Sequence, residues 1–201
     1  RESSSSRGLG DVYKRQEEDA LQGWIDEIQL AGVFAFDTET NSLDAMQADL
    51  VGLSLSVQGG RACYVPVAHI PAGNRGDDEL DLEAIRSNVS PELPKQLART
   101  RVIEMLKPLL EDPGILKVGH NIKYDMQVMA RYGVEVGPID DTMLLSYVLE
   151  GGLHGHGLDE LAALHLGHTN IKFSEGAGTG KNQVSFDHVP LDKALDYAAE
   201  D

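Results

Sequence analysis

The stretch that decides the fold of this chain is Val33-Phe34-Ala35-Phe36-Asp37-Thr38-Glu39-Thr40. Its apolar first half has the length and composition of a buried β-strand, which we predict over residues 33–37. Side chains two positions apart on a strand face the same way. Asp37 and Glu39, at or just past the end of this strand, are therefore expected to present two carboxylates on one side of a sheet.

Two further polar pairs lie on other predicted elements. Asn121 and Asp125 open a helical stretch that follows another short apolar strand. Tyr197 and Asp201 belong to a segment that starts at Pro190, a residue suited to the first position of a helix. Because side chains four apart share a helix face, three separate elements each offer one polar pair.

The four carboxylates among these pairs have the chemistry of a metal site. Hard divalent cations such as Mg²⁺ and Mn²⁺ prefer oxygen ligands, and Mg²⁺ takes only a few carboxylates while keeping several waters. Two ions about 3.5–4 Å apart can activate a water and stabilise the leaving oxygen during attack at phosphorus. The alternative is that the acids are surface charges or helix caps, since a chain with 33 acidic residues forms some pairs by chance. Three pairs together favour a two-metal phosphodiester hydrolase.

The same residues carry a resemblance to a known family. Three motifs resemble those of the 3′–5′ proofreading exonuclease domain of bacterial family A DNA polymerases, the DNA polymerase I family: Asp37-Thr38-Glu39-Thr40, Val118-Gly119-His120-Asn121-Ile122-Lys123-Tyr124-Asp125 and Tyr197-Ala198-Ala199-Glu200-Asp201. Shorter stretches also fall in the family's order, among them 41–44, 50–54, 64–69, 141–143 and 180–183. The tyrosine four residues before the last aspartate is similar to the subgroup of the DEDD superfamily that has Tyr rather than His there.

The resemblance implies a role for each acidic residue. Asp37, Glu39 and Asp201 would hold one divalent ion, and Asp125 together with Asp37 would hold a second. Tyr197 and Glu39 would orient the attacking water. The cofactors implied are two divalent metal ions, Mg²⁺ or Mn²⁺.

The resemblance also implies a set of substrate-binding residues. Leu43 and Phe173 match positions that wedge or stack the terminal bases, and the other matching positions are Thr38, His120, Asn121 and Lys123. The chain departs from the family at His120, where well-known members have Gln. It also departs at residues 151–157, where histidines and glycines replace an Arg near the scissile phosphate, so the group that holds this phosphate is left open.

The fold implied is α/β, a ribonuclease H-like mixed sheet flanked by helices. The activity implied is hydrolysis of 3′-terminal phosphodiester bonds in single-stranded or frayed DNA, with release of nucleoside monophosphates. The partners expected are the 3′ end of a single DNA strand and a polymerase domain that follows in the full-length chain. We expect a monomer.

Length and composition agree with one cytoplasmic domain that has no membrane segment. We expect residues 1–16 to form a polar tail outside the fold and residues 17–201 to form the exonuclease domain, truncated at its C-terminus. The lone cysteine, Cys63, excludes an internal disulfide and fits a reducing compartment. A net charge of −16 argues against a general duplex binder, because nonspecific affinity for DNA comes from Lys and Arg.

Periodicity predicts the remaining elements. A first helix carries a buried stripe of Leu21, Trp24, Ile25 and Ile28, and a second carries Val102, Met105, Leu106 and Leu109. We predict strands at 33–37, 50–57, 62–67 and 115–118, and helices around 121–132, 140–149, 158–166 and 190–201. Pro66 indicates that its strand lies toward an edge, and Pro71 to Thr100 is expected to be a long surface excursion.

Other features of the sequence allow alternative interpretations. The segment Gly176 to Asn182 resembles a phosphate-binding loop but lacks the Ser or Thr after Lys181. His154, His156, His165 and His168 suggest zinc, but no cysteine accompanies them, and we expect solvated loop histidines. Two other functions are a polymerase module that has lost activity and an RNA-trimming exonuclease of ribonuclease D type. The complete acidic set argues against the first, and the extended family A match favours DNA over RNA.

Overall fold

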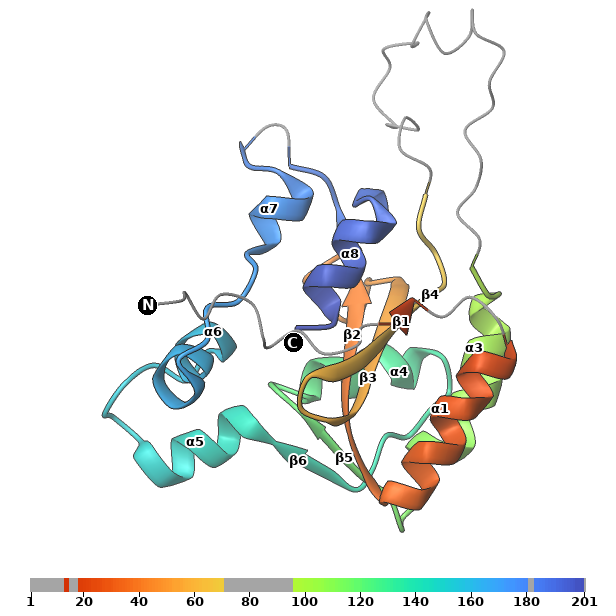
Figure 1. The fold of residues 1–201 in the computed structure, drawn as a ribbon, viewed down its shortest axis with the longest axis horizontal. Helices are drawn as coiled ribbons and strands as arrows, with labels where there is room; N and C mark the ends of the chain where they lie inside the picture. The colour runs from red at the N-terminus through yellow and green to blue at the C-terminus, as the bar shows by residue number, and fades with distance from the viewer. Residues whose placement is uncertain (1–12, 15–17, 71–95, 181–182, 201) are drawn as a thin grey trace, which may run out of the picture.

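The computed structural model of the chain describes residues 13–14, 18–70, 96–180 and 183–200. At its centre is a six-stranded mixed sheet with the strand order β1-β4-β3-β2-β5-β6. Helices pack on both faces of this sheet (Figure 1). The predicted α/β arrangement of a mixed sheet flanked by helices is therefore confirmed.

An antiparallel meander forms the middle of the sheet. It consists of β2 (Val33–Thr40), β3 (Leu50–Gln58) and β4 (Arg61–Pro66). The turn between β3 and β4 contains Gly60 at a φ of 79°, a left-handed conformation that glycine adopts without steric cost. β2 continues to Thr40, beyond the predicted end at residue 37. Asp37 and Glu39 consequently lie inside a paired strand, which fixes their backbone.

Short parallel strands extend the sheet at both edges. β5 (Leu116–Gly119) and β6 (Ile139–Asp141) follow β2, and β5 pairs with β2 only at residues 33–35. At the other edge, β1 (Tyr13–Lys14) pairs with Cys63 and Tyr64 of β4. β1 belongs to the segment 1–16 that we expected outside the fold, so the sheet begins before residue 17. Pro66 lies beyond the pairing with β1, in agreement with its position toward an edge.

One face of the sheet packs against α1 (Glu18–Ala31), α3 (Arg99–Leu110) and α4 (Lys123–Arg131). The predicted stripe of α1 is buried, and Trp24 and Ile28 share a core with Phe34 and Phe36 of β2. α1 and α3 lie side by side (Figure 1). This core immobilises the strand that carries the acidic motif.

Lys117 of β5 is an unusual buried cation in this core. Its ammonium group donates to the carbonyls of Asp112, Ile115 and Gly137, each at 2.8 Å. Burial lowers the pKa of Lys117 below its ordinary value. The three bonds tie the loop before β5 to the loop before β6 and so hold β5 in register.

A second, smaller core lies on the opposite face of the sheet. α7 (Phe173–Ala177), η3 (Phe186–His188) and α8 (Leu191–Ala198) lie over it. Val51 and Tyr64 from the sheet share this core with Ala194 and Ala198 of α8. The helix predicted for 190–201 is thus present over Leu191–Ala198, and Asp201 lies outside the described residues.

The remaining helices lie beyond β6. α5 (Thr142–Glu150) begins two residues later than predicted, because residues 140–141 pair with β5 as part of β6. The Asp141 side chain caps α5 by accepting the amides of Met143 and Leu144. α6 (Leu158–Leu161) continues into the π-helical turn η1 (Ala162–Leu166). Most of the excursion predicted from Pro71 to Thr100 lies outside the described residues.

Candidate active site

β2 places Asp37 and Glu39 on the same face of the sheet. Asp37 lies opposite Ser54 of β3, and Glu39 lies opposite Gly52. Asp37 is half-buried and Glu39 is buried, with 8% of its surface exposed. The strand register therefore places the two acids on one side of the sheet, as the sequence predicts.

Gly52, opposite Glu39, leaves room for the side chain of Tyr64. A Cβ atom added to Gly52 would lie 2.1 Å from the Tyr64 hydroxyl oxygen, far inside van der Waals contact. The fully buried Tyr64 ring therefore crosses directly over the Gly52 backbone. Burial, together with the nearby Glu39 carboxylate, raises the pKa of Tyr64. Tyr64 stays a neutral phenol beside Glu39, and its hydroxyl lies 2.7 Å from His69 Nε2.

The backbone and side chain of Thr38 bind the third acid. Oδ1 of Asp125 accepts the Thr38 N–H at 2.8 Å and the Thr38 hydroxyl at 2.5 Å. Thr38 stands between Asp37 and Glu39, so the carboxylate from α4 is held against the acidic stretch of β2. The pairing is possible because β5 leaves β2 after Ala35, which leaves the Thr38 amide for Asp125.

Asp125 is a strongly perturbed acid. It is 98% buried, and desolvation raises its pKa from 3.8 to about 6 despite the hydrogen bonds from Thr38. Asp141 raises the pKa further through charge repulsion. The fold therefore holds Asp125 in a position where a positive charge would favour its ionised form.

The Tyr124 hydroxyl lies near all three described acids of the site, and sequence reasoning gave it no role. Burial raises its pKa, while its contact with Thr40 lowers it. Asp125, Asp37 and Glu39 each raise it further, so all three carboxylates lie within electrostatic reach of this one hydroxyl. The Tyr124 oxygen lies 2.5 Å from Thr40 Oγ1 and also donates to the Ser42 carbonyl. The tyrosine in the second motif could have signalled this role.

A tight turn connects β5 to α4. Asn121 has a φ of 56° and its N–H donates to Asp141 Oδ1, while His120 Nδ1 lies 2.9 Å from Thr142 Oγ1. α4 begins at Lys123, so the prediction that Asn121 and Asp125 share a helix face is wrong. Asn121 precedes the helix because its amide is used to join this turn to the start of α5.

Tyr197 and Phe173 lie together on the α8 side of the sheet. The Tyr197 ring is 6.0 Å from Phe173 and 5.9 Å from Phe186, and Phe173 stacks on Phe186 at 6.2 Å. Phe173 and Tyr197 are both half-buried. The structure thus brings together two residues predicted for different roles.

Glu200 fixes the end of α8, a role that sequence reasoning missed. Its carboxylate contacts His168 Nε2 at 2.6 Å and accepts the Ile171 N–H. Glu200 also lines a cavity of about 290 Å³ together with Asp37 and His120. The stretch immediately before Asp201 is thereby anchored beside β2.

The other predicted substrate residues lie at the surface. Leu43 is 98% exposed in the loop after β2, Asn121 is exposed in the turn before α4, and Lys123 is exposed at the first position of α4. None of these side chains belongs to either apolar core. They are accessible to a ligand bound near the acids.

The donors gathered here fit hard divalent cations. The described acids Asp37, Glu39 and Asp125 offer only carboxylate oxygens, the ligands that Mg²⁺ and Mn²⁺ prefer. A mixed sheet that carries such acids on its central strand β2 and on α4, the helix after β5, has the arrangement of a nuclease of the ribonuclease H-like class.

Comparisons with known proteins agree with this class. The model of a family described as a 3′–5′ exonuclease matches residues 14–201. DNA polymerase I of Rhizobium leguminosarum is 45% identical over 190 residues, which cover 90% of this chain and 18% of that protein. DNA polymerase I of Pseudomonas aeruginosa is 42% identical over 184 residues, with the same two shares. The chain thus spans less than a fifth of the length of these relatives.

Among solved structures, ribonuclease D of Escherichia coli has the same fold, with a TM-score of 0.62 and 18% identity. The match covers 94% of this chain and 40% of the ribonuclease D chain. The chain belongs to the 3′–5′ exonuclease domains of family A DNA polymerases, a family that depends on divalent metal ions. The resemblance stated on three short motifs is confirmed. Within the described residues, no helix combines the length and apolarity needed to cross a bilayer.

Proposed function

We propose that this domain removes nucleotides from an unpaired 3′ end of DNA and serves as the editing module of a longer polymerase. The relatives that match it are DNA polymerases I of which it spans 18%, which supports a polymerase domain elsewhere in the natural chain. The observation that carries the proposal is the anchoring of Asp125 at Thr38, directly between Asp37 and Glu39. Asp125 is buried and accepts from both the amide and the hydroxyl of Thr38, so it is not one of the surface charges of this acidic chain.

The acids would hold two divalent cations, Mg²⁺ or Mn²⁺. Asp37, Glu39 and Asp201 would bind one ion, and Asp37 with Asp125 the other. When bound, such ions supply an activated water and stabilise the charge on the leaving oxygen. Thr38 positions Asp125 through its amide and hydroxyl, so that the carboxylate needs little reorganisation when a cation arrives.

The aromatic residues would orient the water and the substrate. Tyr197 and Glu39 would hold the attacking water, with the Tyr197 ring fixed by Phe173 and Phe186. Leu43 and Phe173 would contact the terminal bases, and Lys123, Asn121 and His120 would lie along the strand. An unpaired end fits this arrangement because its bases can be splayed onto aromatic faces.

The test is a cleavage assay on a 5′-labelled single DNA strand. We expect a ladder that shortens from the 3′ end, that requires Mg²⁺ or Mn²⁺ and that EDTA suppresses. An RNA strand of the same sequence is the matched comparison, and faster cleavage of RNA would favour the ribonuclease D-type alternative. Release from the 5′ end, or cuts in a circular strand, would overturn the proposal.

A further inference from the structure

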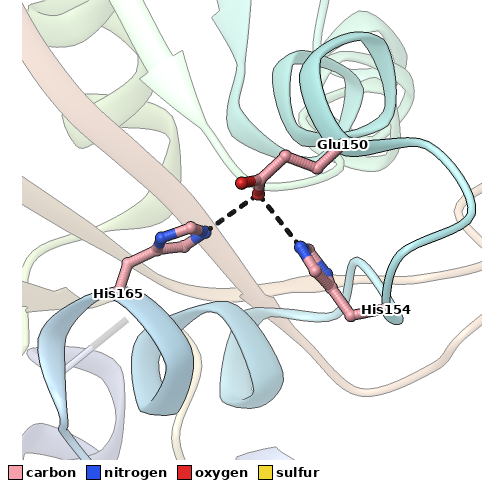
Figure 2. A group of neighbouring side chains, drawn as sticks. All are labelled: Glu150, His154 and His165. Carbon is pink, nitrogen blue, oxygen red and sulfur yellow. Dashed lines mark hydrogen bonds and ion pairs between the residues drawn. The ribbon is translucent and has the colours of Figure 1, made fainter.

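A second group of metal-ligating side chains lies away from the acidic site, beyond β6. Glu150 is the last residue of α5, His154 follows in the connecting loop, and His165 comes from η1. Oε2 of Glu150 lies 3.0 Å from Nε2 of His154 and 3.3 Å from Nε2 of His165. All three ligand atoms lie within 4.8 Å of one another (Figure 2).

These separations are close to those of a tetrahedral zinc site. Zn–N and Zn–O bonds of about 2.0–2.2 Å place neighbouring ligand atoms about 3.3–3.6 Å apart. Two of the three edges, at 3.0 and 3.3 Å, are already near this value. A small movement of partly exposed side chains would complete the triangle, since His165 is 49% and Glu150 36% exposed.

The surroundings of His154 support metal binding through its Nε2 atom. Nδ1 of His154 lies 2.6 Å from the Gly155 carbonyl, which can only accept a hydrogen bond. Nδ1 must therefore carry a proton, and Nε2 carries a second one in the metal-free fold, because it donates to the Glu150 carboxylate at 3.0 Å. A cation would take the place of this second proton on the Nε2 atom that already faces Glu150. Metal-ligating histidines characteristically donate their other N–H to such a carbonyl, which fixes the tautomer and the ring orientation.

The loop that carries His154 is held in place by its neighbour His156. His156 is buried, its Nδ1 lies 2.7 Å from Ser146 Oγ, and its ring is 3.9 Å from the Tyr147 ring. The His154 ring packs 5.1 Å from His156. The expectation that these histidines are solvated loop residues is wrong for His154 and His156, because the chain folds back onto α5.

We infer that Glu150, His154 and His165 form a binding site for Zn²⁺ or a similar borderline divalent cation. Two histidines and one glutamate are a known donor set for zinc and leave a fourth position for water. The absence of cysteine therefore does not exclude zinc. Imidazole ligands distinguish this site from the all-carboxylate site around Asp37, which suits Mg²⁺. A bound ion would cross-link the end of α5 to η1.

The test is metal binding by the 201-residue chain with Asp37→Asn, which weakens binding of zinc at the acidic site. In this background we expect one equivalent of Zn²⁺ by isothermal titration calorimetry, and excess Mg²⁺ should not displace it. His154→Ala, His165→Ala and Glu150→Gln should each weaken this binding at least tenfold, the scale reported for lost metal support. His188→Ala, a histidine outside the cluster, should bind like the parent.

Further readouts separate a site from a structural effect. In the Asp37→Asn background, Zn²⁺ should raise the melting temperature of the chain, and the additional change His165→Ala should remove this effect. Only an intact site favours the folded state by mass action. Circular dichroism identifies any variant that fails to fold. If a histidine variant is unfolded, zinc binding by Glu150→Gln tests the site instead. Unchanged zinc binding in folded His165→Ala, or equal competition by Mg²⁺, would overturn the inference. Cleavage of DNA with Mg²⁺ should be unaffected by His165→Ala. Loss of zinc binding and loss of nuclease activity can therefore be told apart.

Discussion

Asp37 is the one residue that the proposed mechanism assigns to both cations. It lies inside β2 opposite Ser54, where pairing on the β3 side fixes its backbone. Its half-buried side chain also lines the cavity beside Glu200. A single change at Asp37 should therefore affect chemistry far more than folding.

We expect Asp37→Ala to lower the cleavage rate about a thousandfold or more. Metal ions supply several kcal/mol of charge stabilisation, and each 1.36 kcal/mol is about tenfold in rate. Single-turnover assays with saturating Mn²⁺ measure the loss, and circular dichroism checks the fold. A near-normal rate in a folded variant would disprove the two-cation assignment.

Asp125 is predicted to oppose stability in the metal-free chain. Its pKa in the fold, about 6, exceeds the ordinary value of 3.8, so the folded state resists ionisation. The penalty is absent at low pH, grows as the pH rises from about 4 through about 6, and is complete above that. Asp125→Asn should therefore raise the free energy of unfolding at pH 8 by about 1–3 kcal/mol, because Asn remains neutral and can still accept the bonds from Thr38.

Urea denaturation in EDTA at pH 5 and pH 8 measures this effect, which should be smaller at pH 5. Asp140→Asn, which changes an exposed acid in β6, is the matched control and should show little change at either pH. Addition of Mg²⁺ should then stabilise the parent chain more than Asp125→Asn, because binding to the folded state adds to its stability. A destabilised Asp125→Asn at pH 8 without metal would contradict the account.

At the scale of elements, α7 and α8 bring Phe173 and Tyr197 together around Phe186, whose ring packs on Tyr64. Phe173 is half-buried and stacks on the buried Phe186, so it belongs to a core on one side and faces outward on the other. Such a position permits two roles for Phe173, the base stacking that the family resemblance implies and packing in the core. The two roles separate by experiment.

Phe173→Ala should weaken binding of a single-stranded oligonucleotide by about 1–3 kcal/mol, the usual contribution of one stacked base. Fluorescence anisotropy with Ca²⁺ in place of Mg²⁺ would follow binding without cleavage. Phe186→Leu is the comparison, since it perturbs the same ring cluster at a residue only 3% exposed. If both variants lose stability and neither loses affinity per folded molecule, Phe173 is a core residue only.

Periodicity in the sequence predicted the elements that have one clear apolar face. The stripe of α1, the meander of β2 to β4 and strand β5 are present close to their predicted bounds. β6 was missed because three residues give no measurable alternation, and Asp141 both ends that strand and caps α5. The acids of β2 and Asp125 were predictable from motif spacing, whereas the roles of Thr38 and Tyr124 depend on hydrogen bonds between residues more than eighty positions apart.

At the scale of the whole molecule, charge limits what the domain can bind by itself. A net charge of −16 provides little attraction for duplex phosphates, whose nonspecific binding depends on Lys and Arg. Lys123 is exposed two residues before Asp125, and Arg61, which lines the cavity together with Asp37, is paired with Glu27. Under the proposed function, recognition would therefore depend mainly on cations bound at the acids and on stacking of unpaired bases.

We expect the domain to cut mismatched or frayed 3′ ends faster than fully paired ends. Paired ends must first be unstacked, at a cost of a few kcal/mol, before the terminal phosphate can reach the acids. The measurement compares initial rates on hairpins that differ only in the last base pairs. Equal rates on blunt matched and mismatched ends would contradict selection by strand state.

The bond from the Thr38 amide to Asp125 also offers a spectroscopic view of the site. An amide proton held 2.8 Å from a carboxylate changes its chemical shift when that carboxylate is protonated or binds a cation. Because Thr38 is buried in the central strand, its amide should also exchange slowly with solvent. In a ¹⁵N spectrum this single resonance would report the ionisation of Asp125 and the arrival of Mg²⁺, with no nucleic acid present.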